Sequence, residues 1–297
     1  MSSSVSTPDV EVVIPTRNRP AKLERCLAAL AGARSELEFP VLVCDSSDDE
    51  RHHVVQAICA EHSFVSVQRH SGKNVAAARN ACASFATGEV LINVDDDIQV
   101  DDDAIVELVK RYRASPVPCA VAGSVSWHGV YSHPVVMRYI GYGRSARQGE
   151  SPSFLVGAFF AYSRELALAL PWNERIRTSD DRFMGALWRS HEVHLNYAPA
   201  ARATHDPEHV VYDVHEQASH IYANLFDALL ANPELKRAAA YELLGFLAGA
   251  RMHCRSLSGA RRYVTAWYRG NRMFMRDQSY LRQLVSRKLP ETLYERG

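Results

Sequence analysis

Short apolar runs alternate with helix-like segments through the first third of the chain, and this alternation constrains the fold more than any other feature. The runs are rich in β-branched residues and lie at 10–15, 41–44, 64–67 and 90–94. The segments between them carry apolar residues at helical spacing, as at 20–30, 54–60 and 75–86. Strands that alternate with helices form a mostly parallel sheet with helices on both faces, so the sequence predicts an α/β fold.

Polar clusters follow three of these predicted strands at the point where each strand ends. They are PTRNR at 15–19, DSSDD at 45–49 and DDD at 95–97. Ligands of parallel sheets bind at the carboxyl ends of the strands, so we expect the three clusters to line one rim. The three consecutive aspartates repel one another, and a fold tolerates them best when solvent, a bound cation or a catalytic task compensates their charge.

Charge and cysteine content exclude several classes of protein. The chain of 297 residues has 34 basic and 34 acidic residues, and this zero net charge argues against nucleic acid as the main partner. The six cysteines lack C-x-x-C spacing, so we expect reduced core thiols in a cytoplasmic protein and no zinc site. They are Cys26, Cys44, Cys59, Cys82, Cys119 and Cys254.

The chain divides into three parts by its pattern. Residues 1–9 are polar, lack the features of a signal peptide and are expected to form a disordered tail. Residues 10–211 carry the α/β pattern, and from 212 to 297 the pattern turns helical. We therefore expect one α/β domain with a C-terminal helical extension, whose apolar segment 238–250 is too short to cross a bilayer.

The later part of this extension, residues 251–288, is basic and aromatic. Such a segment can dock on an anionic membrane surface, pair with another subunit to form an oligomer, or cover a substrate site. Ordinary helix packing, with arginine side chains that extend into solvent, is the simplest alternative. The sequence leaves these possibilities open.

Five motifs follow one another along the chain. They are PTRNR, DSS at 45–47, NVAAARNACASFATGEVLINVDDDI at 74–98, VGAFFAYSR at 156–164 and SDDRFMGALWR at 179–189. In order and spacing they resemble the successive motifs of a family-2 glycosyltransferase with the GT-A fold, a Rossmann-like sheet flanked by helices. The resemblance covers about residues 10–210.

The resemblance implies a metal-dependent enzyme that moves a sugar from a nucleotide-diphosphate sugar to an acceptor hydroxyl, with inversion at the anomeric carbon. A hard divalent cation, Mn²⁺ or Mg²⁺, would bridge the phosphates of the leaving group. By resemblance Asp97 binds the metal, Asp95 holds the ribose hydroxyls or a metal-bound water, and Asp96 supports either role. His205 is the candidate that completes the metal shell and His209 is the reserve, although a single histidine can equally be structural or solvated.

The same resemblance assigns residues to the donor, a UDP, GDP or dTDP sugar. Asp45 would accept an N–H of the nucleobase, although DSSDD is equally typical of a polar turn with a helix cap. Arg79 would lie near the diphosphate or the sugar, against the alternative of an exposed helical arginine. The other donor candidates are Pro15, Thr16 and Arg17 beside the nucleotide, and Gly157, Ala158 and Phe159 beside the sugar.

Asp180 and Asp181 stand where the resembling family has a Glu-Asp pair, at the start of an apolar helix. Inverting transfer needs a carboxylate that deprotonates the acceptor hydroxyl on the face opposite the leaving group. We therefore expect Asp181 to be the base and Asp180 to be its neighbour at the acceptor. Helix N-capping by Ser179 or Asp180 is the structural alternative.

Two other functional classes compete with this interpretation. A sugar nucleotidyltransferase shares an α/β nucleotide site, but it needs a glycine-rich phosphate loop after the first strand, and PTRNRP is not such a loop. The third class is a non-catalytic nucleotide- or carbohydrate-binding scaffold. The intact set of acidic residues argues against a scaffold.

Overall fold

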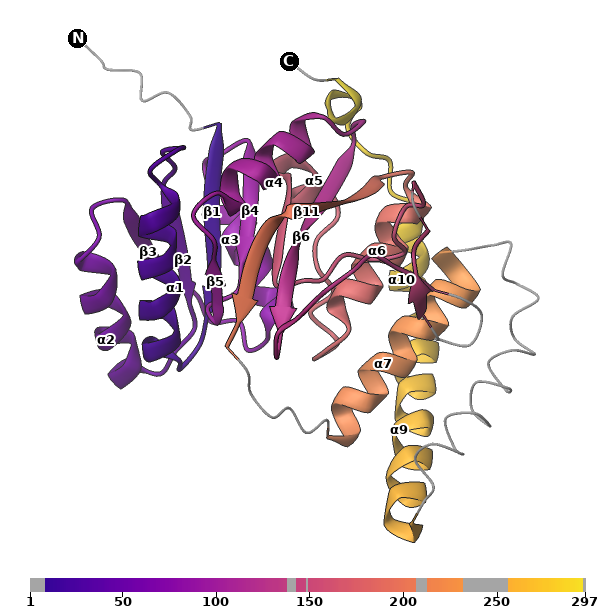
Figure 1. Ribbon diagram of the computed structural model, residues 1–297. Helices are drawn as coiled ribbons and strands as arrows, with labels where there is room; N and C mark the ends of the chain where they lie inside the picture. Colours follow the sequence, from indigo (N-terminus) through magenta and orange to yellow (C-terminus); the bar gives the residue numbers. More distant parts are fainter. Residues whose placement is uncertain (1–8, 138–142, 148, 207–212, 232–255, 296–297) are drawn as a thin grey trace.

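The computed structural model of the protein describes residues 9–137, 143–147, 149–206, 213–231 and 256–295 (Figure 1). A central sheet runs through the molecule with helices packed on both of its faces. Its strand order is β3-β2-β1-β4-β10-β6-β11-β5, and β7 pairs with β6. Strand order therefore places β4, the strand that precedes the three aspartates, near the middle of the sheet.

The four strands predicted from the sequence form the parallel half of the sheet. They are β1 (Val10–Thr16), β2 (Val41–Asp45), β3 (Val65–Arg69) and β4 (Val90–Val94). β1 lies between β2 and β4, and all three strands are buried along their whole length. Because these strands run in the same direction, their carboxyl ends meet at one edge of the sheet.

The other half of the sheet is mixed. β10 (Phe159–Ser163) runs antiparallel between β4 and β6 (Cys119–Trp127), whereas β11 (His194–His205) runs parallel to β6. β5 (Ile98–Val100) is antiparallel to β11, and the short β7 (Val130–Tyr131) to β6. β8 (Val135–Met137) and β9 (Gly143–Ser145) form a small separate sheet. The α/β prediction is confirmed, and the antiparallel β10 separates the parallel strands β1 to β4 from the parallel pair β6 and β11.

Helices cover the sheet in two groups, each with its own core. One core holds α1 (Pro20–Ala33), α2 (Asp49–Ala60) and α4 (Ala104–Arg113). The other holds α3 (Val75–Phe85), α5 (Arg164–Ala169) and α6 (Asp180–Ser190). Local sequence fixes where several helices begin: Pro20 occupies the first turn of α1, and the Asn74 side chain accepts the Ala77 N–H at the start of α3, 2.9 Å away.

The C-terminal helices pack on the α/β core. α7 (Val214–Phe226) continues into a π-helical turn, η2 (Asp227–Ala231), and the chain ends in α9 (Leu257–Arg276), α10 (Gln278–Val285) and η4 (Glu291–Tyr294). Phe226, Leu281 and Leu293 are buried in the same core as α6. The boundary expected between 211 and 212 touches residues outside the described ranges.

The cysteines among the described residues are buried, as the sequence predicts. Five of the six cysteines lie within them, and all five are free and buried, as expected for reduced core thiols. Within the described ranges, no helix combines the length and apolar character needed to span a bilayer. The tail at 1–8, the apolar segment 238–250 and His209 lie outside the described residues.

Candidate active site

The three polar clusters meet at the carboxyl edge of the parallel strands, as the sequence predicts. Thr16 and Asp45 are paired residues at the ends of β1 and β2. The Thr16 hydroxyl donates to Asp96 Oδ2 at 2.7 Å, which joins the end of β1 to the turn that follows β4. Residues from three separate strand ends therefore form one polar rim.

Asp96 is the structural member of the aspartate triplet. Its side chain is fully buried, and besides the Thr16 hydrogen bond it has the guanidinium of Arg19 3.2 Å away. Burial raises the pKa of Asp96 to about 7, because removal of water penalises the carboxylate more than Arg19 and Thr16 favour it. Asp96 thus has no open face toward a ligand, and it holds its two neighbours in place.

Asp97 and His205 come together although they are far apart in the sequence. Asp97 Oδ1 lies 3.5 Å from His205 Nε2, and Oδ2 accepts from Arg19 at 2.8 Å with the Lys22 ammonium 3.5 Å away. The His205 ring stacks on Trp127, with ring centroids 3.9 Å apart and planes at 18°. This stacking fixes the imidazole so that Nε2 faces the carboxylate.

The Asp97–His205 pair fits a divalent cation that takes most of its ligands from a substrate. Mg²⁺ and Mn²⁺ accept carboxylate oxygen, and the imidazole nitrogen suits transition metals. Within the described ranges, no group of three or more His, Cys, Asp and Glu side chains is arranged to hold a metal. Asp97 and His205 are therefore the side chains of this rim that could hold a metal ion.

A buried arginine joins the triplet to α6. Arg79 on α3 is only 3% exposed, and its Nη2 donates to Asp95 Oδ1 at 3.0 Å and to the Gly157 carbonyl at 2.7 Å. Its Nη1 pairs with Asp180, and its guanidinium lies 4.6 Å from the centre of the Trp172 ring. The alternative of an exposed helical arginine is therefore wrong, because Arg79 is held by two carboxylates and a carbonyl.

Asp181 follows Asp180 at the start of α6 and lies beside this network. It is half-buried, and its Oδ1 accepts the N–H of Arg182 at 2.7 Å. Burial and the neighbouring Asp180 carboxylate raise the pKa of Asp181 to about 6. A Cβ placed on Gly157 would lie 3.3 Å from both Arg79 Nη2 and Asp181 Cβ. Glycine therefore lets the backbone after residue 156 pass between the arginine and this aspartate.

The turn that leads into α6 is held by α7, which the sequence did not indicate. Ser179 occupies the N-cap position with φ of 59°, but its side chain makes no capping hydrogen bond and its hydroxyl instead contacts His220 Nδ1. The Arg177 N–H donates to Ser219 Oγ at 3.1 Å, and the Thr178 hydroxyl to the Glu216 carbonyl at 3.2 Å. These contacts position Asp180 and Asp181 from outside the α/β half.

Asp45 and the remaining donor candidates occupy different environments. Asp45 is fully buried; its Oδ1 accepts the Ser47 N–H at 2.8 Å and its Oδ2 lies 2.6 Å from His52 Nδ1. Its assignment to a nucleobase therefore stays a prediction. Of the other donor candidates, Pro15 and the Phe159 ring are buried. Arg17 is exposed and donates to the Lys73 carbonyl, and the Ala158 carbonyl accepts the Asp95 N–H.

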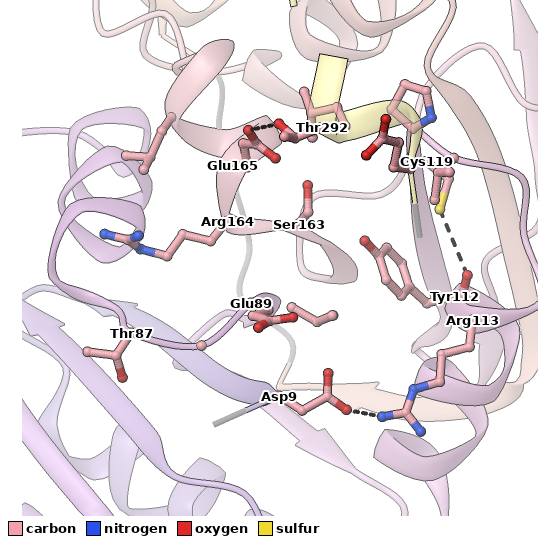
Figure 2. A pocket seen from close by; sticks show the side chains of 17 residues that line it. Asp9, Thr87, Glu89, Tyr112, Arg113, Cys119, Ser163, Arg164, Glu165 and Thr292 are labelled. Atoms are coloured by element: carbon pink, nitrogen blue, oxygen red, sulfur yellow. Dashed lines mark hydrogen bonds and ion pairs between the residues drawn. The ribbon is translucent and has the colours of Figure 1, made fainter. Parts of the chain in front are cut away.

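A cavity of about 860 Å³ lies at the opposite end of the sheet (Figure 2). It is lined by residues at the amino ends of the parallel strands, such as Asp9 and Cys119, and by Thr292 near the chain's end. Asp9 pairs with Arg113, and Thr292 donates to Glu165. This cavity is separate from the aspartate rim.

The comparison with known families agrees with this geometry. The sequence profile described as "Glycosyl transferase family 2" matches residues 11–170. The fold and the rim thus define a glycosyltransferase. Since the match spans more than half of the chain, the protein belongs to glycosyl transferase family 2.

Solved glycosyltransferase structures show the same fold. The mannosyltransferase PcManGT of Pyrobaculum calidifontis, in complex with GDP-Man and Mn²⁺, is 19% identical, with a TM-score of 0.54 over 95% of this chain and 87% of that one. S. aureus TarS 1-349 in complex with UDP-GlcNAc is 13% identical, with a TM-score of 0.60 over 93% and 90% of the two chains. At these identities the likeness shows the fold, which is the GT-A fold.

Curated relatives match over a shorter stretch. An N-acetylglucosaminyltransferase of Azorhizobium caulinodans is 26% identical over 115 residues, which is 37% of this chain and 29% of the relative. That of Rhizobium meliloti is 28% identical over 125 residues, which is 40% of this chain and 29% of the relative. The matched part therefore spans less than a third of either relative.

Proposed function

We propose that the protein is a metal-dependent, inverting glycosyltransferase that moves a sugar from a nucleotide-diphosphate sugar to an acceptor hydroxyl at the aspartate rim. The observation that carries this proposal is the buried Arg79, which pairs with Asp95 on one side and Asp180 on the other. The ion pairs join the strand end proposed for the diphosphate to the start of the helix that carries the proposed base. Donor and acceptor groups are thereby linked in one network.

On the donor side, Asp97 and His205 hold the divalent cation in this proposal, and Asp95 orients the ribose hydroxyls. When bound, such a cation neutralises charge on the departing diphosphate. Asp95 suits its role because Arg79 and the Asn93 amide, 3.1 Å away, fix its carboxylate while it keeps 24% of its side-chain surface exposed. Asp45 accepts the nucleobase N–H in place of its contact with His52.

On the acceptor side, Asp181 takes the proton of the attacking hydroxyl. The hydroxyl oxygen bonds to the anomeric carbon as the bond from that carbon to the diphosphate oxygen breaks, and the nucleoside diphosphate leaves. A carboxylate with a pKa of about 6 is ionised at neutral pH and is a stronger base than an ordinary aspartate. Asp180 is committed to Arg79, so we assign it the positioning role and Asp181 the base.

The proposal is tested with a panel of nucleotide-sugar donors. Their order follows the ligands of the similar solved structures and the names of the curated relatives. The solved structures include complexes with UDP-GlcNAc and with GDP-Man and Mn²⁺, and the curated relatives are N-acetylglucosaminyltransferases. We therefore place UDP-GlcNAc first, followed by other UDP sugars, GDP sugars and dTDP sugars. Each is to be supplied with Mn²⁺ or Mg²⁺.

Thermal unfolding with this panel tests the proposal. A ligand that binds only the folded state raises the melting temperature, so at least one nucleotide should do so, and more strongly with Mn²⁺. Asp97→Asn should lose the Mn²⁺-dependent part of the rise, measured against the melting temperature of the same variant without ligand. Asp101→Asn, a change at an exposed acid near the same turn, is the control and should behave as wild type.

Product analysis separates the competing functions. A glycosyltransferase releases the nucleoside diphosphate, whereas a sugar nucleotidyltransferase releases pyrophosphate from a nucleoside triphosphate and a sugar phosphate. Full transfer activity in EDTA would contradict metal dependence. Binding of every responsive nucleotide without any turnover would leave only the scaffold function.

A further inference from the structure

Helix α9 carries a charge unlike that of the rest of the chain. Between Leu257 and Arg276 it contains five arginines and no acidic residue, although the whole protein has a net charge of zero. The arginines are Arg261, Arg262, Arg269, Arg272 and Arg276, and all five are exposed. The helix is therefore a concentrated positive surface on a neutral molecule.

The same helix exposes a stripe of large apolar side chains. Leu257 is 93% exposed, Met275 68%, Tyr268 60% and Val264 50%. Their spacing of seven, four and seven residues places all four on one side of a helix. Arg261 and Arg272 fall beside this stripe at the same helical spacing, so apolar and cationic groups share the outward surface.

The other side of α9 is the one that packs on the protein. Ala266, Gly270 and Phe274 are buried, and a Cβ on Gly270 would lie 2.7 Å from the Ala218 carbonyl of α7. Contact with α7 therefore fixes the rotation of α9 about its own axis. The apolar stripe points away from that contact and is not needed to hold the helix in place.

We propose that this surface of α9 docks on an anionic lipid bilayer. A helix that presents apolar and aromatic side chains flanked by arginine lies in the interface of a membrane, where the apolar groups enter the acyl boundary and the guanidinium groups face lipid phosphates. Anionic lipid supplies the negative charge that α9 lacks. The docking goes beyond the proposed function and does not depend on it.

A second copy of the chain is a poorer occupant of the same surface. Arg276 is paired with Asp277 at the end of α9, 2.9 Å away, but two α9 helices in contact would still bring the other four arginines of each helix together, and residues 257–276 contain no carboxylate to pair with them. Like charges at close range oppose association, and the cost is largest at low salt. The charge pattern of α9 therefore selects a negative partner.

The position of α9 gives the docking a direction. In Figure 1 the first turns of α9 extend past the end of the sheet at which the arrowheads of β6 and β11 lie. That end carries the aspartate rim, since β11 ends at His205. A membrane bound along the projecting part of α9 would thus lie on the same side of the molecule as the rim.

Co-sedimentation with vesicles tests the proposal on the full chain. The wild type should bind vesicles of phosphatidylcholine mixed with phosphatidylglycerol and not vesicles of phosphatidylcholine alone, and added salt should weaken the binding. The double change Arg261→Gln with Arg272→Gln should weaken binding about thirty-fold, since each basic side chain near an anionic surface contributes roughly fivefold. The double change Lys110→Gln with Arg111→Gln on α4 removes the same charge elsewhere and should bind as wild type.

A second pair of changes tests the apolar stripe. Leu257→Ser with Tyr268→Ser should also weaken binding, and circular dichroism should show an unchanged fold because both side chains are exposed. Equal binding of both vesicle types, no binding of either, or wild-type binding by the α9 arginine variant would overturn the proposal. So would a wild-type dimer that either α9 variant converts to a monomer, because a second copy would then be the occupant.

Discussion

Arg79 shows how a single residue can be obligatory for the fold and for the proposed chemistry at once. The guanidinium is almost fully buried, and the carboxylates of Asp95 and Asp180 keep its pKa above the usual range despite that burial. Removal of one partner from a buried pair leaves an uncompensated charge, which costs more than the pair itself contributes. Each of these three residues therefore depends on the others.

The first prediction concerns this buried ion pair. Arg79→Ala should lower the free energy of unfolding by about 3–5 kcal/mol, because Asp95 and Asp180 would lose the cation between them. The control is Arg69→Ala, which removes an arginine that pairs with Asp49 at the exposed edge of the sheet and should cost less than about 1 kcal/mol. Urea unfolding of both variants measures the difference, and equal losses would contradict the assigned role.

The second prediction concerns the proposed base. Asp181→Asn should keep nucleotide affinity and lower kcat by about a hundredfold or more, the usual loss when a general base is removed. Since the base works as the carboxylate and its pKa is about 6, kcat/KM of the wild type should fall as the pH drops below about 6 and level off above it. Steady-state kinetics across this pH range measures both effects.

Two comparisons decide the assignment of the base. Asp103→Asn changes an exposed aspartate at the start of α4 that makes no capping hydrogen bond, and it should leave kcat unchanged. If Asp181→Asn turns over normally while Asp180→Asn is inactive, the base is the preceding residue. If both remain active, the base lies elsewhere.

At the residue scale, the sequence located the rim better than it described the contacts there. The carboxyl ends of neighbouring parallel strands lie at one edge of a sheet, so the strand pattern alone predicts that the three clusters come together. The clusters are residues 15–19, 45–49 and 95–97. The sequence did not show that Arg19 and Lys22 neutralise Asp97, or that Trp127 supports His205. Such contacts join segments that only the completed fold brings together.

At the scale of elements, α7 is the unexpected contributor to the site. It follows β11 in the chain, but its side chains and backbone hold residues 177–179, the turn before the proposed base. The position of Asp181 therefore depends on a helix from the C-terminal extension. Helical periodicity predicted that such a helix exists, but not which loop it would contact.

The third prediction tests this dependence. Ser219→Ala removes the acceptor of the Arg177 N–H, so kcat should fall about threefold to tenfold, as expected for one hydrogen bond of about 1 kcal/mol, while nucleotide affinity stays the same. Ser84→Ala on α3 is a matched control, because both hydroxyls also donate to the carbonyl four residues earlier. A loss of nucleotide affinity in Ser219→Ala, or equal kcat for both variants, would argue against a positioning role.

Strands were predicted well where the sheet is regular and poorly where it is not. The predicted bounds of β1, β2, β3 and β4 agree with the structure within one or two residues, since each is a compact β-branched run. β6 was not predicted, because CAVAGSVSW is mostly small residues and lacks the bulk that marks a buried strand. The antiparallel direction of β10 depends on pairing with β4 and β6, which no local pattern records.

At the scale of the whole molecule, the C-terminal extension completes a core instead of forming its own. Tyr222 of α7 accepts from the Asn173 amide and donates to Asp277, both at 3.3 Å. Asp277 is buried and also pairs with Arg175, 2.8 Å away. These contacts tie the segment before α6 to the junction of α9 and α10. Residues 10–211 therefore depend on the C-terminal extension for part of their packing.

The fourth prediction is that a fragment of residues 1–211 does not fold cooperatively. Phe226, Leu281, Leu284 and Leu293 are buried in the core that contains α6, and each such side chain stabilises the fold by about 1.5–3 kcal/mol. Their loss alone, about 6–12 kcal/mol, is comparable with the whole stability of a typical domain. Thermal unfolding should show no sharp transition for 1–211, whereas deletion of residues 1–8, for which the sequence predicts a polar tail, should leave the transition of the full chain unchanged. A sharp transition of the fragment that shifts with a nucleotide and Mn²⁺ would instead show that the first 211 residues fold and bind the donor alone.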